Sequence, residues 1–179
     1  GNINWPLVKA DFAILRAGFG KETSQKDPMF EAYYAGAKAA NIPVGAYWYS
    51  YAKSVAEAKQ EAAACLAAIK GKQFEFPIYF DIEDKSQTSL STSVLTAMCE
   101  AFCETLEAAG YFVGVYANTN WFRNHLDHAR LAKKYTIWLA DYRTGYDKTL
   151  KRDMHQYTST GTVAGISGHV DMNTCTRDF

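Results

Sequence analysis

The sequence predicts an α/β protein whose parallel sheet closes as an irregular TIM-type β/α barrel with reduced helices. Apolar, strand-like runs alternate with helix-like segments along most of the 179 residues. The strand-like runs are nearly continuous in hydrophobicity, as in parallel sheets covered on both faces. Helix-like segments fade toward the C-terminus, and no linker or charge block interrupts the chain. We therefore expect a single domain over residues 1–179.

The chain begins with a β-α-β unit. Residues 11–19 form an apolar run that ends at Gly20, and residues 42–51 form a second run rich in aromatic side chains, which favour strands. Between them lies an alanine-rich segment with Asp27 as the expected N-cap and Pro28 at the first helical position.

The next helix and strand lead to the most unusual stretch of the sequence. Ser54 and Glu57 form a capping box at the start of a helix that stops at Gly71. A third strand follows in residues 77–84, "PIYFDIED". An apolar run that ends in three acidic residues out of four needs an explanation, because burying an unpartnered carboxylate is costly.

The remaining elements follow in the same manner until the helices fade. We expect helices in residues 91–110 and 121–134, and strands in residues 111–118, 135–142, 154–161 and 169–173.

Composition excludes several classes of function. Nineteen Lys and Arg balance nineteen Asp and Glu, so no basic field exists to bind nucleic acid or an anionic membrane. No apolar run is long enough for a transmembrane helix, and no phosphate loop or dinucleotide fingerprint is present. The four cysteines read as buried free thiols, and we expect no metal and no cofactor. The aromatic fraction of 15% suits sugars and peptides, although cores use aromatic residues too.

In a parallel β/α barrel the active site forms at the C-terminal ends of the strands. Polar and aromatic residues recur at the ends of successive predicted strands. They are Tyr47, Tyr49, Tyr51, Asp81, Glu83, Tyr116, Asn118, Trp138, Asp141, Tyr142, Gln156, Tyr157 and Asp171.

Asp81 and Glu83 are the sharpest signal. The two-residue period of a strand points both to the same side of the sheet, with Cα atoms roughly 6.5 to 7 Å apart. Two carboxylates this close oppose each other's ionisation, so one can keep its proton and act as the general acid of a glycosidase. A solvated strand end or a metal site is the alternative. Asp84 points to the opposite face and reads as a solvated or capping residue, and Arg16 is expected either to pair with one of the acids or to form a structural salt bridge.

Several motifs, in this order, resemble glycoside hydrolase family 25, the Chalaropsis-type lysozymes. They are "GNINW", "DFAILRAGFG", "DPMFEAYYAGAKAANIPVGAYWYSYA", "PIYFDIED", "GVYAN", "YTIWLADY" and "HQYTSTGTVAGISGHVDMN". The resemblance implies an irregular β/α barrel that cuts the β-1,4 bond between N-acetylmuramic acid and N-acetylglucosamine in peptidoglycan, outside the cell or in the cell wall.

The resemblance also implies roles for individual residues. Glu83 matches the general acid, Asp81 the carboxylate two residues before it, and Asp171 a further acid of the site. Asp81 is implied to orient or stabilise a substrate acetamido group, although an inverting route is an alternative. The residues implied to line the glycan groove are Tyr47, Tyr49, Tyr116, Trp138, Tyr142 and Gln156.

One departure from the family pattern concerns the start of the sequence. The pattern has a short aspartate-bearing strand before the segment that matches "GNINW", whereas Gly1 is the first residue here. We expect a barrel that lacks this first strand and hydrolyses poorly. Two alternatives are a catalytically impaired peptidoglycan-binding module and another barrel glycosidase such as a family 18 chitinase, whose longer acidic pattern would not place a tyrosine at Tyr79.

Overall fold

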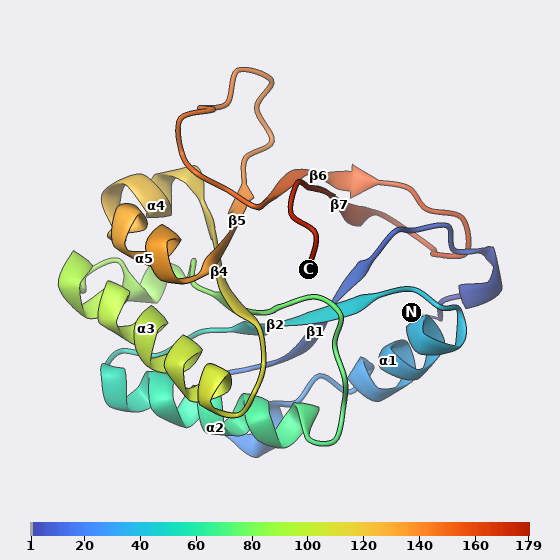
Figure 1. Ribbon diagram of the computed structural model, residues 1–179, viewed down its shortest axis with the longest axis horizontal. Helices are drawn as coiled ribbons and strands as arrows, with labels where there is room; N and C mark the ends of the chain where they lie inside the picture. Colours follow the sequence, from blue (N-terminus) through green and yellow to red (C-terminus); the bar gives the residue numbers. More distant parts are fainter. Residues whose placement is uncertain (1) are drawn as a thin grey trace.

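The computed structural model describes residues 2–179 and contains one seven-stranded sheet in the order β1 to β7 (Figure 1). Gly1, the first residue of "GNINW", lies outside the described residues. The strands are β1 Ala13–Phe19, β2 Val44–Tyr49, β3 Ile78–Asp81, β4 Val113–Asn118, β5 Thr136–Ala140, β6 Met154–Gly161 and β7 Val170–Cys175.

The sheet is parallel from β1 to β6, and β7 pairs with β6 in the antiparallel direction. It curls into a half-barrel, and within residues 2–179 no ladder joins β1 to β7. An isolated antiparallel bridge joins Ile3 to Ile166, in the connection between β6 and β7. The predicted β/α architecture is confirmed in this curled, open form.

Helices cover the convex face of the sheet. α2 (Val55–Ile69) and α3 (Thr92–Ala108) pack against each other, and α1 (Phe30–Ala39) lies against β1 and β2 (Figure 1). No helix of the described chain lies between β5 and β7, so the predicted reduction of the helices is confirmed. The larger hydrophobic core lies under the helices, whereas a smaller cluster built around Tyr79, Tyr116 and Trp138 fills the concave side.

Capping explains where most helices begin. The side chain of Ser54 accepts a hydrogen bond from the Glu57 amide, as predicted, but the Glu57 carboxylate accepts from the Lys53 amide at 2.7 Å rather than from the Ser54 amide that a capping box requires. The Asp27 side chain accepts from the Met29 amide at 2.8 Å, so it stabilises the turn before α1 and is not the N-cap.

The helix predicted over residues 121–134 is wrong, because the structure divides this segment. α4 spans Thr119–Asn124 and α5 spans His128–Lys134. Asp127 causes the division: its side chain accepts from the Arg130 amide and so starts a new helix.

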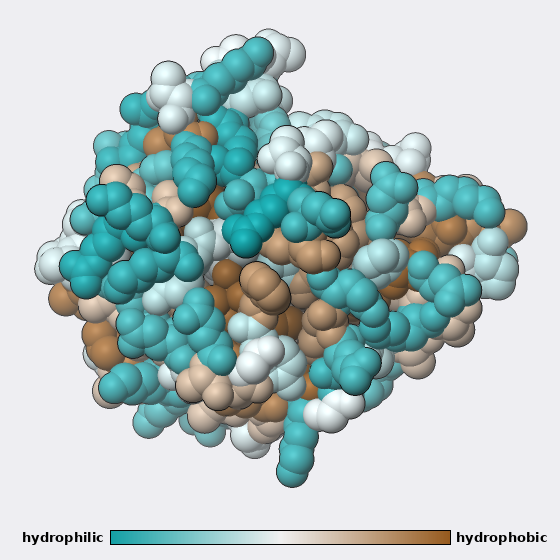
Figure 2. Space-filling view, in the orientation of Figure 1, coloured by the Kyte–Doolittle hydropathy of each residue, from teal (hydrophilic) through white to brown (hydrophobic). Residues whose placement is uncertain are grey.

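The surface of the molecule carries both hydrophobic and hydrophilic side chains. Figure 2 shows hydrophobic residues near the middle of this face and in smaller groups toward its left and right edges, among hydrophilic residues. Among residues 2–179 no helix is long and apolar enough to cross a membrane.

Candidate active site

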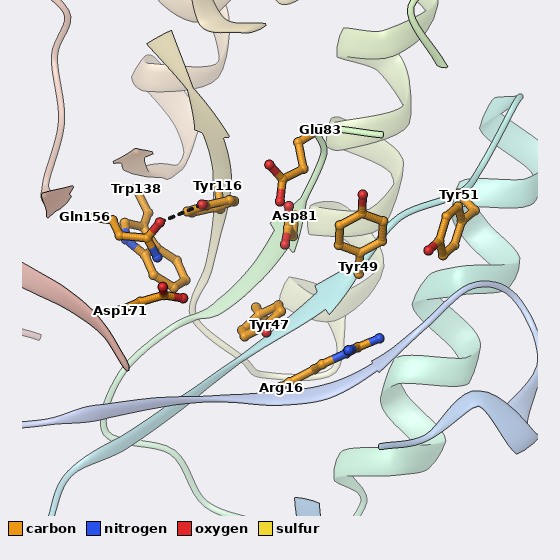
Figure 3. A pocket seen from close by; sticks show the side chains of 10 residues that line it. All are labelled: Arg16, Tyr47, Tyr49, Tyr51, Asp81, Glu83, Tyr116, Trp138, Gln156 and Asp171. Atoms are coloured by element: carbon orange, nitrogen blue, oxygen red, sulfur yellow. Dashed lines mark hydrogen bonds between the residues drawn. The ribbon is translucent and has the colours of Figure 1, made fainter. Parts of the chain in front are cut away.

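The register of the sheet aligns four side chains at its C-terminal edge. Tyr49 pairs with Asp81, Asp81 with Tyr116, and Tyr116 with Trp138, across strands β2 to β5. These residues open onto a pocket of about 310 Å³ (Figure 3). The pocket is lined by Arg16, Tyr47, Tyr49, Tyr51, Asp81, Glu83, Tyr116, Trp138, Gln156 and Asp171.

The two predicted carboxylates meet in this pocket. β3 ends at Asp81, so Glu83 lies in the segment beyond the strand and not on the strand as predicted. Both side chains nevertheless reach the same pocket, with Glu83 above Asp81 in Figure 3. Asp81 is only 4% exposed, whereas Glu83 is half-buried. The less buried Glu83 is therefore the more accessible of the two carboxyl groups.

Burial raises the pKa of Asp81 well above its ordinary value, and the negative charge of Glu83 raises it further. Burial also raises the pKa of Glu83, while a hydrogen bond with Asp81 acts against this rise. The pair therefore titrates as a unit in which Asp81 holds the proton more tightly and donates it to Glu83.

One carboxyl oxygen of the pair has no partner. Oδ1 of Asp81 is buried and makes no hydrogen bond to any described residue. Buried polar atoms are nearly always paired, so this oxygen is free to accept a hydrogen bond from a water molecule or a ligand.

Asp171 enters the pocket from β7, on the side of Trp138 and Gln156 (Figure 3). Partial burial raises its pKa, and its negative charge in turn raises the pKa of Glu83. The pocket thus brings all three predicted acids together.

Hydrogen bonds hold one wall of the pocket. The hydroxyls of Tyr116 and Tyr142 donate to Oε1 of Gln156 at 2.8 and 2.6 Å, and the indole N–H of Trp138 donates to Asn173 at 2.8 Å. Since Oε1 of Gln156 already accepts two bonds, the amide nitrogen is the atom left to donate to a ligand. The predicted groove residues Tyr47, Tyr116, Trp138 and Gln156 all line this pocket.

The opposite wall is formed by Tyr49 and Tyr51, whose ring centroids lie 4.9 Å apart. The Tyr49 hydroxyl donates to Oδ2 of Asp84 at 3.1 Å, and Oδ1 of Asp84 accepts from the Ser86 amide. Asp84 therefore caps the short 3₁₀ turn Lys85–Gln87, and the capping alternative predicted for it is confirmed.

Arg16 also lines the pocket, where its positive charge lowers the pKa of Asp81. Its guanidinium lies 3.8 Å from a carboxylate oxygen of Asp27, which stabilises the turn before α1. The structural salt bridge is therefore the alternative that the structure supports for Arg16.

A second pocket of about 810 Å³ adjoins the first and shares Glu83 and Tyr116 with it. Tyr142 lines this second pocket, as do Asn118 and Asp141. Sequence reasoning missed its other polar residues, which follow β4 and β5 in helices and loops without a strand-end position to mark them. These residues are Thr119, Asn120, Arg123, Asn124, Arg143 and Asp147.

Asp141, one of the predicted strand-end residues, has a structural partner. Both oxygens of its carboxylate bind Arg143, and Thr119 donates to one of them at 2.7 Å. Tyr157, another predicted strand-end residue, lies outside both pockets. Within the described part of the chain, no group of three or more His, Cys, Asp and Glu residues is arranged to hold a metal ion.

Fold and site together define a class of protein. A curled β/α sheet that presents a buried carboxyl pair at its C-terminal edge, between aromatic walls, is typical of a glycoside hydrolase. The chain belongs to the glycosyl hydrolases family 25, whose family model matches residues 1–166. This membership decides against the family 18 alternative. Asp171, which the resemblance implied as a further acid of the site, lies beyond the matched residues, and the structure places it at the pocket.

Curated relatives and solved structures agree with the family. The autolytic lysozyme of Clostridium acetobutylicum is 27% identical over 97% of this chain and 52% of its own length, and lysozyme M1 of Streptomyces globisporus is 27% identical over 97% and 63%. The chain thus spans about half to two thirds of these relatives. The Streptomyces coelicolor lysozyme superposes with a TM-score of 0.84 at 25% identity, over 99% of this chain and 88% of that one. The autolysin LytC of Streptococcus pneumoniae superposes with a TM-score of 0.82 at 26% identity, over 97% and 43%.

Proposed function

We propose that this domain is a peptidoglycan hydrolase, an N-acetylmuramidase that cleaves the β-1,4 bond between N-acetylmuramic acid and N-acetylglucosamine. The observation that carries the proposal is the Asp81–Glu83 pair, held with raised pKa values at the floor of an open pocket with aromatic walls. Two curated relatives are named as lysozymes, which supports peptidoglycan as the substrate.

Glu83 acts as the general acid. In the free protein the shared proton resides mainly on Asp81, because Asp81 is the more deeply buried carboxyl group. An acetamido N–H of the substrate that donates to the unpartnered Oδ1 of Asp81 stabilises the ionised form of Asp81. The proton then moves to Glu83, which transfers it to the glycosidic oxygen. Substrate binding thereby prepares the acid.

The walls of the pocket bind the sugar. Tyr49, Tyr51 and Trp138 offer ring faces and edges for the C–H faces of the pyranose, and the Gln156 amide nitrogen donates to a hydroxyl or acetamido oxygen. Asp171 stabilises positive charge that develops at the anomeric carbon, from the side opposite Tyr49.

Similar proteins also support a biological setting for this domain. We infer that residues 1–179 act as one catalytic domain on glycan strands of the bacterial cell wall, outside the cell. Similarity to the CTP1L endolysin, 30% identical with a TM-score of 0.79 over 93% of this chain and 58% of that one, supports a bacterial or phage lysin.

The test is mass analysis of purified peptidoglycan digested with this protein. A muramidase produces new reducing ends on muramic acid. New reducing ends on glucosamine would instead make it a glucosaminidase and contradict the proposal. No product, together with retention on insoluble cell wall, would favour the binding module.

A further inference from the structure

Glu61 is a buried carboxyl group that the proposed reaction does not use. It lies on α2 with 1% of its surface exposed. Lys21 pairs with Glu57 at 2.9 Å, and within residues 2–179 no cation forms an ion pair with Glu61. A carboxyl group buried without a cation needs other compensation. The other buried residues on its helix are small or apolar: Ala58, Ala62, Ala64, Cys65, Ala68 and Ile69.

The compensation comes from the chain that follows β2. The Ser50 hydroxyl donates to Oε1 of Glu61 at 2.7 Å, and the Tyr51 amide donates to Oε2 at 2.9 Å. Ser50 Oγ in turn accepts from the Gln87 side chain at 3.1 Å and from the Ala52 amide at 3.2 Å. Because both lone pairs of this oxygen are occupied, its single proton is directed to Glu61.

This network reaches the catalytic pocket along two routes. Ser50 lies between Tyr49 and Tyr51, which form the aromatic wall, and its amide donates to the Asp81 carbonyl at 2.9 Å. Gln87 closes the 3₁₀ turn that begins after Asp84, the residue that holds the Tyr49 hydroxyl. The Gln87 side chain also donates to the Ala52 carbonyl at 2.9 Å, so the two loops are joined at this point.

We propose that Glu61 is a positioning residue for the saccharide-binding wall, acting through Ser50 and the Tyr51 amide to hold Tyr49 and Tyr51 against the turn after Glu83. The inference rests on the proposed function, because it assigns this wall to the sugar. The role requires two acceptor oxygens on one side chain. The ionised carboxylate, which prevails above the raised pKa of Glu61 of about 7, offers two, whereas the isosteric amide of glutamine offers one and would leave either Ser50 or Tyr51 facing an N–H group.

The test compares Glu61→Gln with the wild-type protein on soluble, uncrosslinked peptidoglycan. Loss of one buried hydrogen bond in the wall should raise KM about tenfold, while kcat stays within about threefold because the acid pair is untouched. In Glu61→Met, which removes both acceptor oxygens, hydrogen exchange at the Tyr51 amide should become faster. Ser50→Ala removes the same link from the other side and should raise KM in the same way.

Glu57→Gln is the matched control, since Glu57 lies one turn earlier on α2 and binds Lys21 and the Lys53 amide. Its KM should match the wild type. Unchanged Tyr51 exchange in Glu61→Met, which has no acceptor oxygen at this position, overturns the inference, even if the wild-type protein proves inactive and the proposed function fails. In an active enzyme, faster exchange of the Tyr51 amide with an unchanged KM also overturns it. Glu61 would then stabilise the loop after β2 without affecting how Tyr49 and Tyr51 bind the saccharide.

Discussion

Asp81 and Glu83 stand two positions apart in the chain, yet their surroundings differ. Asp81 ends a strand and is buried, with one oxygen left without a hydrogen bond. Glu83 lies beyond the strand and reaches both the catalytic pocket and its larger neighbour. The deeper group can hold a proton that the more accessible group delivers, which is how one pair serves two roles.

Glu83→Gln should abolish turnover while the fold is kept. The amide preserves the shape of the side chain and removes only the transferable proton, so reducing-end release should fall at least about a hundredfold. The melting temperature should stay close to that of the wild type, since glutamine keeps the size and shape of the glutamate side chain. Wild-type-like lysis by this variant would refute Glu83 as the acid.

Asp171→Asn should shift the pH dependence of kcat/KM. Burial is the main cause that raises the pKa of Glu83, and the charge of Asp171 adds to it. Without that charge the Asp81–Glu83 pair loses its shared proton at lower pH, so the alkaline limb of the profile should move to lower pH. Asp178→Asn, an exposed change outside both pockets, should leave the limb in place. An alkaline limb that does not move in Asp171→Asn would argue against electrostatic coupling between Asp171 and Glu83.

At the scale of elements, much of the architecture was predictable from local signals. Ser54 and Ser91 cap α2 and α3, and glycines follow both helices at Gly71 and Gly110 with positive φ angles of 76° and 92°. The break between α4 and α5 was missed because Asp127 lies within a continuous polar pattern that resembles one helix. Asp127 starts a new helix by accepting a hydrogen bond from the Arg130 amide, and this contact is not visible in the pattern.

Ser91→Ala should lower the free energy of unfolding by about 1 kcal/mol, because the Val94 amide loses the side chain that caps it. Urea unfolding measures this change, and specific activity should be unaffected since α3 lies on the convex face. Ser89→Ala, an exposed serine in the preceding turn, serves as the control. Equal stability of the two variants would show that the cap contributes nothing.

At the scale of the whole molecule, buried carboxyl groups make stability depend on pH. Burial raises the pKa of Glu61 to about 7, although hydrogen bonds from Ser50, Tyr51 and Ala52 oppose this rise. The folded state therefore keeps a proton that the unfolded chain loses near its ordinary pKa of 4.5. The stabilisation is complete below that value and is lost as the pH rises toward 7.

Glu61→Gln should remove this contribution. Between pH 4.5 and 7 the difference in unfolding free energy between wild type and variant should change by up to about 3 kcal/mol, with the wild type losing stability relative to the variant. Glu57, Lys21 and Cys65 are the other titratable groups coupled to Glu61, and all remain in the variant. Denaturant unfolding at a series of pH values measures the difference. A constant difference would mean that Glu61 titrates normally.

The sequence by itself determined the order of strands and helices, the acid pair and the aromatic strand ends, because periodicity, caps and glycines act over a few neighbouring residues. Only the tertiary structure decided which of these residues meet. Tyr116 and Gln156 are 40 positions apart yet share a hydrogen bond, and Gln87 reaches Ser50 across 37 positions. Such pairings depend on strand register and on the curl of the sheet, which no local pattern encodes. For the same reason no local pattern marks Glu61 as a buried carboxyl group bonded to Ser50 and Tyr51.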